Sequence, residues 1–392
     1  MTDTARGALG PGLGASAVGD GPARRRRRWA RRAALGLAAS VAAAGGGGWL
    51  LYATLSANIT ADDAAARELA RYERERPTAL VKGAQNILLI GSDTRSGDGN
   101  ARYGRDLGSE RSDTTILLHL AANRRSATAV SLPRDLMVDV PRCLRTDGSR
   151  SAPVFTMFNS AYAVGGSACS IRTVEKLTGV RIDHHVVVDF SGFKEMVDAV
   201  DGVRVCVKEP IHDKAAELTL PAGQVMLNGE QALGYVRARE SLGDGSDTER
   251  MERQQQFLGA LVDKMQSSDV LLNPVKLYPV LDAATSSLTT DPELASLRGL
   301  YQLVRGLRNI PIKQVQFLTV PRKSYVHDAN RDQLVEPEAG KLFARLRADQ
   351  PVAVTRTAPA QAALPGGDTG SRGVPSPAPT FRGSTAAEHG CT

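Results

Sequence analysis

The feature that most constrains this chain is an uncharged stretch close to its first residue. Residues 33–55 contain no Asp, Glu, Lys or Arg, and about 20 helical residues of this kind span the hydrocarbon core of a bilayer. A run of arginines, Arg24–Arg28 with Arg31 and Arg32, lies immediately before it. Arginines that flank a membrane span stay on the cytoplasmic side. The sequence therefore predicts a single-pass membrane protein with a cytoplasmic N-terminus and an extracytoplasmic domain.

A cleaved signal peptide is the alternative interpretation of the same segment. Ala42–Ala44 offers small residues behind an arginine-rich start, as a cleavage site requires. The apolar run continues through Trp49 to Leu55, which favours an anchor that is retained. Under both interpretations the bulk of the chain is exported.

The charge of the chain is concentrated in the same N-terminal segment. The 392 residues carry a formal net charge of +7. Residues 1–32 contain eight arginines against Asp3 and Asp20, a charge of +6, so the remainder carries +1. A short basic tail beside an apolar run indicates an anionic membrane surface as its partner. Because the tail lacks the interleaved aromatic residues that stack on bases, we expect no nucleic acid as a partner.

Composition divides the chain into five segments. A first segment without an apolar pattern should be disordered, and a last segment rich in Pro, Gly, Ser and Thr should be a flexible extension. After the anchor, a charged helical stretch that ends near Pro77 should form a stalk. The expected boundaries are 1–32 for the disordered Arg-rich tail, 33–55 for the transmembrane anchor, 56–85 for the stalk, 86–347 for the catalytic domain with its motifs in 86–265, and 348–392 for the disordered tail.

The region between the two tails alternates strand and helix patterns. Short apolar runs bounded by Gly, Pro or Asp predict strands, and strands that alternate with helices form a sheet covered on both faces. The predicted strands are 86–91, 115–120, 128–132, 186–190, 203–207, 235–239 and 315–320, and the predicted helices are 170–178, 192–200, 247–265 and 292–308. The expected fold class is α/β.

Four cysteines fit an exported domain, where disulfides persist. Cys143 and Cys169 flank one connection and are the expected pair. Cys206 lies in an apolar run and is expected to be buried, and Cys391 lies in the tail. The alternative is that none of the four is bridged.

Two aspartates lie at the ends of predicted strands. Asp93 follows the first strand and Asp113 precedes the second. A hard cation such as Mg²⁺ is held by one or two carboxylates together with substrate phosphate, so this pair is the predicted metal site. The ordinary alternative is that each aspartate bonds its own backbone in a turn.

Arginines gather near the same strand ends. Pro133 stops a strand and presents Arg134 at its end, because proline removes a backbone donor. In the predicted strand 235–239, alternation places Tyr235, Arg237 and Arg239 on one face. Two arginines on one face repel each other unless an anion lies between them, so a phosphate is expected there.

The predicted helix that begins near Asp247 repeats this signal. Arg250, Arg253 and Gln254 lie along one stripe near its start. Cations at a helix N-terminus oppose the helix dipole, whereas an anion there is stabilised by free N–H groups. The alternative is that both arginines pair with Asp247 and Glu249.

A cluster of guanidinium groups suits phosphate because each presents a planar fork of donors. The expected ligand is a pyrophosphate. Its expected binding residues are Arg111, Arg134, Arg237, Arg239, Arg250, Arg253 and Gln254, of which Arg134, Arg237 and Arg239 are the expected catalytic residues. The sequence contains no Walker loop, no G-x-S-x-G motif and no Cys–His pairing, and His184–His185 is expected to cover a strand. Catalysis should therefore come from positioning and charge stabilisation, with direct transfer to an incoming hydroxyl.

The order of these motifs resembles the LytR-CpsA-Psr family of wall-polymer ligases. The matching blocks are Asn86–Arg95, Arg111–Thr115, Ser131–Asp135, Phe158–Tyr162, Gly202–Val205, Asn228–Arg239 and Asp247–Gln254. The resemblance implies an α-β-α sandwich, Mg²⁺, and transfer of an anionic glycopolymer from a polyprenyl pyrophosphate carrier to the muramic acid 6-hydroxyl of peptidoglycan, with release of polyprenyl phosphate. One departure is the long loop between Asp93 and Asp113, which contains Asp98 and Asp106.

Two other functions fit the same residues. A pyrophosphatase would act on the same lipid carrier with water as the acceptor. A regulator would bind wall precursors without turning them over. Product analysis with and without peptidoglycan separates the first of these from a transferase.

Overall fold

A computed structural model describes residues 22–93, 112–238, 247–266, 274–356, 380–388 and 391. The chain divides into two compact units, Met1–Thr54 and Leu55–Thr392, which are described separately. Helix α1 (Pro22–Asn58) accounts for the described part of the first unit. Its segment Trp29–Asn58 is long and apolar enough to cross a membrane. Residues 22–32, expected to be disordered, belong to this helix, and residues 1–21 lie outside the described part.

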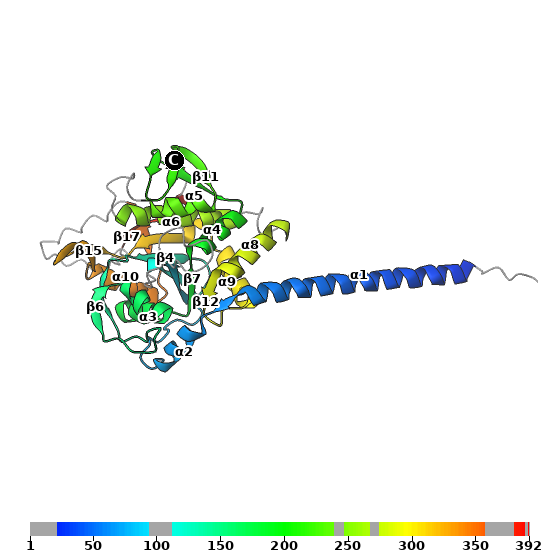
Figure 1. The fold of residues 1–392 in the computed structure, drawn as a ribbon, viewed down its shortest axis with the longest axis horizontal. Coiled ribbons are helices and arrows are strands. Elements are labelled where there is room, and N and C mark those ends of the chain that lie inside the picture. Colours follow the sequence, from blue (N-terminus) through cyan, green and yellow to red (C-terminus); the bar gives the residue numbers. More distant parts are fainter. Residues whose placement is uncertain are drawn as a thin grey trace, which may run out of the picture. The chain divides into compact units, whose positions relative to one another are not determined.

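The second unit is built on a mixed central sheet (Figure 1). The sheet has nine strands in the order β1-β12-β7-β2-β3-β4-β13-β17-β16. Strands β2, β7, β4 and β13 run in one direction and the other five run in the opposite direction. The strands are β1 (Thr60–Ala61), β2 (Gln85–Ser92), β3 (Ser112–Leu120), β4 (Ala127–Leu132), β7 (His184–Val188), β12 (Leu288–Thr290), β13 (Val315–Thr319), β16 (Ala353–Thr355) and β17 (Thr380–Thr385). The ends Ser92, Val188, Leu132 and Thr319 therefore share one side of the sheet, which we call the carboxyl edge.

Helices cover both faces of this sheet. One face packs against α2 (Asp63–Arg71), α3 (Ser160–Thr178) and α10 (Glu338–Arg347) around a core that includes Leu88, Val130 and Phe158. The other face packs against α6 (Asp247–Gln266) and α9 (Leu297–Arg308). Successive side chains of the buried strands point to opposite faces of the sheet and pack into two separate cores. The predicted α-β-α sandwich is therefore confirmed.

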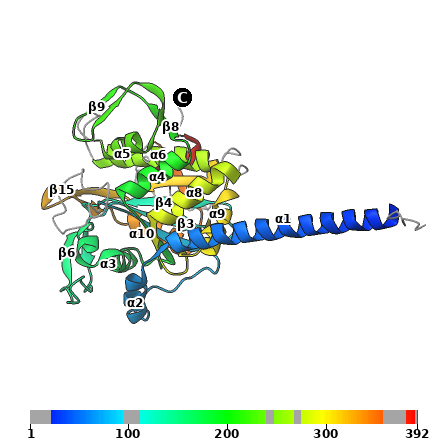
Figure 2. The same ribbon diagram turned by 45° about the vertical axis from the view of Figure 1, so that its right-hand side comes forward.

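A smaller lobe lies at the top of Figure 2. It contains α4 (Phe190–Ala199) and α5 (Gly229–Arg237), with β8 (Val203–Val207) paired to β11 (Gly223–Leu227) and β9 (Ile211–Asp213) paired to β10 (Leu218–Leu220). The strand predicted at 203–207 is present, but it does not join the main sheet. The remaining elements are the hairpins β5 (Met137–Val140)–β6 (Val154–Met157) and β14 (Arg322–Tyr325)–β15 (Asp328–Leu334), α8 (Pro274–Ser287), and the short helices η2 (Ile312–Gln314) and η3 (Ala386–Glu388).

The strand predicted at 235–239 was wrong. Residues 229–237 form helix α5, whose start is fixed by a capping box between Asn228 and Gln231. A helix turns by about 100° per residue, so Tyr235 and Arg237 lie on different sides of it. Tyr235 is buried, whereas Arg237 is only partly covered.

The predicted stalk also differs from the structure. Strand β1 pairs with β12 in the main sheet, and α2 packs against α3. Arg76 forms an ion pair with buried Glu175 at 2.8 Å between Nη2 and Oε1, and the guanidinium of Arg172 lies 3.4 Å from the ring centre of Tyr72. Residues 60–76 are therefore part of the domain.

The C-terminal segment contributes to the domain as well. Strands β16 and β17, expected to lie in a disordered tail, extend the main sheet next to β13. A disulfide joins Cys206 on β8 to Cys391, and a second disulfide joins Cys143 to Cys169. The first bridge corrects the expectation that Cys206 is a buried thiol. Its two partners are 185 residues apart in the sequence.

Candidate functional site at the carboxyl edge

The two predicted metal ligands lie where β2 ends and β3 begins. Gly91 lies opposite Thr114, and Ser92 lies opposite Ser112. Asp113 is therefore the extra residue of a β-bulge, a distortion that re-aims a side chain and is frequent beside active sites. Asp93 directly follows Ser92, so both predicted metal ligands lie at the carboxyl edge.

Arg134 reaches the same place from the end of β4. Its Nη1 lies 3.0 Å from Oδ1 of Asp113, and its Nε lies 3.4 Å from Oδ2 of Asp135. Asp135 in turn lies 3.4 Å from Nη1 of Arg331 on β15. The result is a chain of alternating charges, Asp113–Arg134–Asp135–Arg331, which we call the charge chain. The side chains of Asp113 and Arg134 are 35% and 23% exposed, so a ligand can reach this pair.

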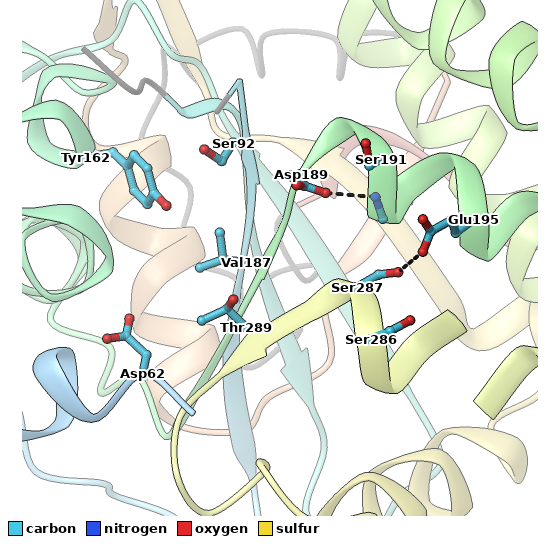
Figure 3. A pocket seen from close by; sticks show the side chains of 11 residues that line it. Asp62, Ser92, Tyr162, Val187, Asp189, Ser191, Glu195, Ser286, Ser287 and Thr289 are labelled. Carbon is cyan, nitrogen blue, oxygen red and sulfur yellow. Dashed lines mark hydrogen bonds between the residues drawn. The ribbon is translucent and has the colours of Figure 1, made fainter. Parts of the chain in front are cut away.

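A cleft of about 350 Å³ opens beside the aspartates. Figure 3 shows its polar side chains around a hollow between β7, α3, α4 and α8. Ser92 lines it and adjoins Asp93, which connects the cleft to the metal ligands predicted from sequence. The lining residues are Asp62, Ser92, Tyr162, Val187, Asp189, Ser191, Gly192, Glu195, Ser286, Ser287 and Thr289.

The wall of this cleft is held in place by its own hydrogen bonds. Asp189 caps α4 and accepts from the Gly192 amide at 2.8 Å, and Ser287 donates to Glu195 at 2.9 Å (Figure 3). Asp189 was missed in the sequence, although an aspartate between an apolar strand and a helix is a common N-cap signal.

Asp62 forms the floor of the cleft near α2. Burial raises the pKa of its carboxyl group, but hydrogen bonds from His185 and Ser167 outweigh burial and lower the pKa from 3.8 to about 2. Nε2 of His185 lies 3.2 Å from Oδ2 of Asp62. The carboxylate stands between the imidazole and the hydroxyl, so this arrangement is not that of a serine nucleophile, which needs the imidazole in the middle.

Arg237 reaches the carboxyl edge from a helix rather than from a strand. It is the last residue of α5, and its guanidinium lies 4.7 Å from the ring centre of Phe190. Phe190 directly follows Asp189 of the cleft. A cation stacked on an aromatic face keeps a fixed direction, and Arg237 is therefore oriented beside the cleft.

The arginine stripe of α6 holds the end of α5. Arg253 donates to the carbonyl oxygen of Ala238, and Gln254 donates to that of Val236 at 3.2 Å. Burial lowers the pKa of Arg253. Arg250 is almost fully buried. In this structure Arg253 and Gln254 satisfy the last carbonyl groups of a helix, a task that any helix end requires.

Two of the predicted pyrophosphate ligands, Arg111 and Arg239, lie outside the described residues, as do Asp98 and Asp106. Apolar side chains between residues 186 and 197 pack into two hydrophobic cores, for example through the Phe193 and Phe257 rings, whose centres are 5.4 Å apart.

The opposite edge of the sheet also carries ionisable groups. His184 lies with Asp291 and Glu293 so that one ligand atom from each falls within 4.8 Å of the others. Asp291, however, already accepts from the backbone amides of His185, Glu293 and Leu294. The carboxylate therefore anchors a turn, and the expectation that His184 and His185 serve packing agrees with their burial.

Residues 53–348 match the model of the LytR_cpsA_psr family. This match covers well over half of the chain. The chain belongs to this family. Asp93, Asp113 and Arg134 lie within the residues matched, at the carboxyl edge, where Asp113 and Arg134 form an ion pair.

Relatives and solved structures agree with this assignment. LcpB of Corynebacterium glutamicum is 39% identical over 210 residues, which are 52% of this chain and 47% of LcpB. The Bacillus subtilis polyisoprenyl-teichoic acid–peptidoglycan teichoic acid transferase TagV is 29% identical over 297 residues, or 74% of this chain and 70% of TagV. The chain thus spans about half the length of its Corynebacterium relatives.

Among solved structures, a LytR-Csp2A-Psr enzyme from Actinomyces oris shares the fold with a TM-score of 0.54 at 21% identity, covering 69% of this chain and 93% of that one. The crystal structure of Bacillus subtilis TagV has a TM-score of 0.53 at 26% identity, covering 69% and 98%.

Proposed function

We propose that this protein is a phosphotransferase that attaches an anionic glycopolymer, delivered on a polyprenyl pyrophosphate carrier, to peptidoglycan. The observation that carries the proposal is the meeting of Asp113 and Arg134 at a carboxyl edge that also opens into a polar cleft. In open α/β sheets, ligands bind at the carboxyl ends of the strands. The name of the TagV relative, a teichoic acid transferase, supports the reaction class.

The donor set at this edge fits Mg²⁺. Asp93 and Asp113 supply carboxylate oxygens, and hard oxygen ligands in small number are what Mg²⁺ takes when substrate phosphate completes its shell. When bound, the cation would neutralise charge that builds on the leaving phosphate. Arg134 forms an ion pair with Asp113. When metal and phosphate bind together, Asp113 can exchange Arg134 for the metal, and Arg134 can exchange Asp113 for the phosphate.

The arginines divide into two roles in this proposal. Arg134 and Arg237 bind the pyrophosphate, because both reach the carboxyl edge and are partly exposed. Arg253 and Gln254 position α5, and with it Arg237, through its terminal carbonyl groups. Arg111, Arg239 and Arg250 remain proposed phosphate ligands from the sequence motifs alone.

The reaction joins the glycopolymer phosphorus to an acceptor oxygen. The hydroxyl oxygen of a muramic acid residue forms a bond to the phosphorus next to the glycan, and the bond from that phosphorus to the bridging oxygen breaks. Polyprenyl monophosphate leaves with the bridging oxygen, and the acceptor proton passes to solvent. Fixed cationic donors stabilise the charge that develops on both sides.

Membrane topology forms part of the proposal. The apolar helix in the described part of the chain and the arginines before it support a cytoplasmic N-terminus and a domain outside the membrane, because positive flanks stay inside. A reporter enzyme that works only outside the cytoplasm should give signal when fused after residue 392 and none when fused near residue 30. Signal from the short fusion would reverse the orientation.

The function is tested by analysing products with and without acceptor. Full-length protein in lipid nanodiscs, Mg²⁺ and a synthetic polyprenyl pyrophosphate-linked oligosaccharide should release polyprenyl monophosphate when peptidoglycan is added. Mass spectrometry should then find the oligosaccharide phosphate on muramic acid. Equal release without peptidoglycan, with free oligosaccharide phosphate as product, would identify a pyrophosphatase instead.

A further inference from the structure

An exposed aromatic surface stands next to the carboxyl edge. The β14–β15 hairpin follows the end of β13, and the ring of Tyr325 lies 6.0 Å from that of Phe155 on β6 and 5.2 Å from that of His327. Phe155 is 50% exposed and Val326 is 71% exposed. We call Phe155, Tyr325, Val326 and His327 the aromatic platform. Exposed apolar side chains that cluster on a protein surface commonly mark a binding site.

The platform is joined to the charge chain by backbone and side-chain contacts. The amide of Asp332 on β15 donates to the carbonyl of Asp135 at 3.1 Å, and Leu136 forms a bridge with Asp332. Arg331, from the same strand, pairs with Asp135, which also pairs with Arg134. The hairpin and the Arg134 loop therefore form one continuous structure, and the platform adjoins the proposed phosphate site.

The other half of the platform is also fixed in place. Phe155 lies on β6, which pairs with β5. Strand β5 directly follows the Arg134 loop in the sequence. The disulfide between Cys143 and Cys169 fastens the segment after β5 to α3. A rigid aromatic surface loses little conformational entropy when a ligand covers it.

The strand order places the platform and the cleft on opposite sides of the two aspartates. The cleft is lined from β12, β7 and β2, whereas the platform follows β4 and β13. In phosphoryl transfer the attacking and leaving oxygens lie roughly in line, on opposite sides of the phosphorus. A donor bound on the cleft side would therefore meet its acceptor from the platform side.

We propose that the aromatic platform is a subsite for the acceptor, a glycan strand of N-acetylated hexosamines. The C–H faces of pyranose rings are apolar and stack on aromatic rings, while their hydroxyl and amide groups seek charged partners. Such partners are present, since Asp139 is the cross-strand neighbour of Phe155 and Asp328 lies 3.6 Å from Arg331. This inference rests on the proposed function, because that function supplies the acceptor.

Kinetics on the full-length protein in nanodiscs test the subsite. Phe155→Leu and Tyr325→Leu keep apolar bulk but remove the ring. Each should raise the KM for uncross-linked peptidoglycan glycan strands about tenfold, which corresponds to the loss of one stacking contact. The KM for the lipid-linked donor should not change. Tyr325→Trp retains a stacking surface and should keep the acceptor KM of the wild type.

A matched control is Tyr301→Leu on α9. Tyr301 is 64% exposed, so the substitution removes a surface ring of the same kind away from the platform. It should leave both KM values unchanged. Thermal unfolding of every variant confirms that each one folds.

Calorimetric titration of the same glycan strands without donor separates this inference from the proposed function. Suppose that both leucine variants bind the strands about tenfold more weakly than the wild type, and that the wild type never transfers glycan. This result would support the subsite and overturn the transferase. Transfer with unaltered acceptor KM and binding in both variants would overturn the subsite. An effect on donor KM alone, or on self-association in sedimentation, would assign the platform to the lipid carrier or to a second copy and would also overturn it.

Discussion

The two edges of the central sheet carry the same kinds of side chain but satisfy them differently. At the opposite edge, His119 bonds Asn86 and Asp349, and the side chains of His119 and Asp349 are 5% and 14% exposed. At the carboxyl edge, the Asp113–Arg134 pair is 35% and 23% exposed. A largely covered carboxylate that accepts from a backbone amide is committed to the fold, whereas a more exposed pair can exchange partners. Exposure, rather than residue type, separates the candidate site from the framework.

The metal ligands should show the largest effect of this difference. Asp93→Asn and Asp113→Asn should each reduce Mg²⁺-dependent transfer roughly 10³-fold, because a cation that neutralises the leaving phosphate stabilises the transition state by several kcal/mol. Turnover should fall further than donor affinity. The measurement is initial rate against Mg²⁺ concentration, with chelator abolishing wild-type activity.

Variants in the long loop between Asp93 and Asp113 test whether the metal ligand lies there instead. If Asp113→Asn kept full metal-dependent turnover while Asp98→Asn or Asp106→Asn lost it, the ligand would lie in the loop. If both Asp93 and Asp113 variants transferred normally in chelator, the metal mechanism would be wrong.

Removal of the arginine beside Asp113 should have the next largest effect. Arg134→Ala should lower kcat by about 10²-fold, since one preorganised donor to a developing charge contributes on this order. Thermal stability should change little, because partly exposed ion pairs contribute only about 0–1 kcal/mol. Single-turnover kinetics and a thermal melt check both parts. An unfolded variant with normal specific activity in its folded fraction would make Arg134 structural.

The opposite edge should respond in the reverse way. Asp349→Asn, the same chemical change as Asp113→Asn, should cost about 1–2 kcal/mol of unfolding free energy, because the carboxylate accepts from His119 and from the Ala122 amide. Asparagine also tolerates the positive φ of this residue. Urea unfolding measures the loss. Transfer per folded molecule should equal that of the wild type, and a specific loss of turnover would break the comparison.

The carboxyl group of Asp62 should have a smaller, pH-dependent effect on the free energy of unfolding. Its pKa is about 2 in the fold against 3.8 ordinarily, so the carboxylate stabilises the fold by about 2 kcal/mol above pH 5, and this contribution is lost as pH falls toward 2. The difference in unfolding free energy between wild type and Asp62→Asn should therefore shrink to about half by pH 3. Exposed Asp63→Asn is the control. A difference that stays constant with pH would show that the hydrogen bonds, not the charge, stabilise this corner.

The interior strands could be predicted from the sequence because their apolar runs are local signals. Strands β2, β3, β4 and β13 appear within a few residues of their predicted ranges. The edge strands β1 and β16 and the adjoining strand β17 were not recognised, since they carry no long apolar run and exist through pairing with distant segments. The Cys206–Cys391 bridge depends on the same long-range closure.

The candidate site was predictable in part for a similar reason. Motif order pointed to Asp93, Asp113 and Arg134, but the bulge that presents Asp113 and the link from Asp135 to Arg331 depend on strand register. The mistaken strand at 235–239 arose because Tyr-Val-Arg-Ala-Arg alternates polar and apolar residues over only five positions. The capping residues Asn228 and Gln231 upstream held the decisive helical signal.

Oxygen labelling tests the central claim most directly, namely that the carboxyl edge transfers a phosphoryl-linked glycan to a hydroxyl and not to water. The full-length protein is incubated with lipid-linked donor, Mg²⁺ and peptidoglycan in water enriched in ¹⁸O. The masses of all phosphorylated products are then measured by mass spectrometry. Transfer predicts a muramic acid phosphodiester and a polyprenyl monophosphate that both lack ¹⁸O. Glycopolymer phosphate that carries one ¹⁸O, with no label-free phosphodiester on the wall, would contradict the account.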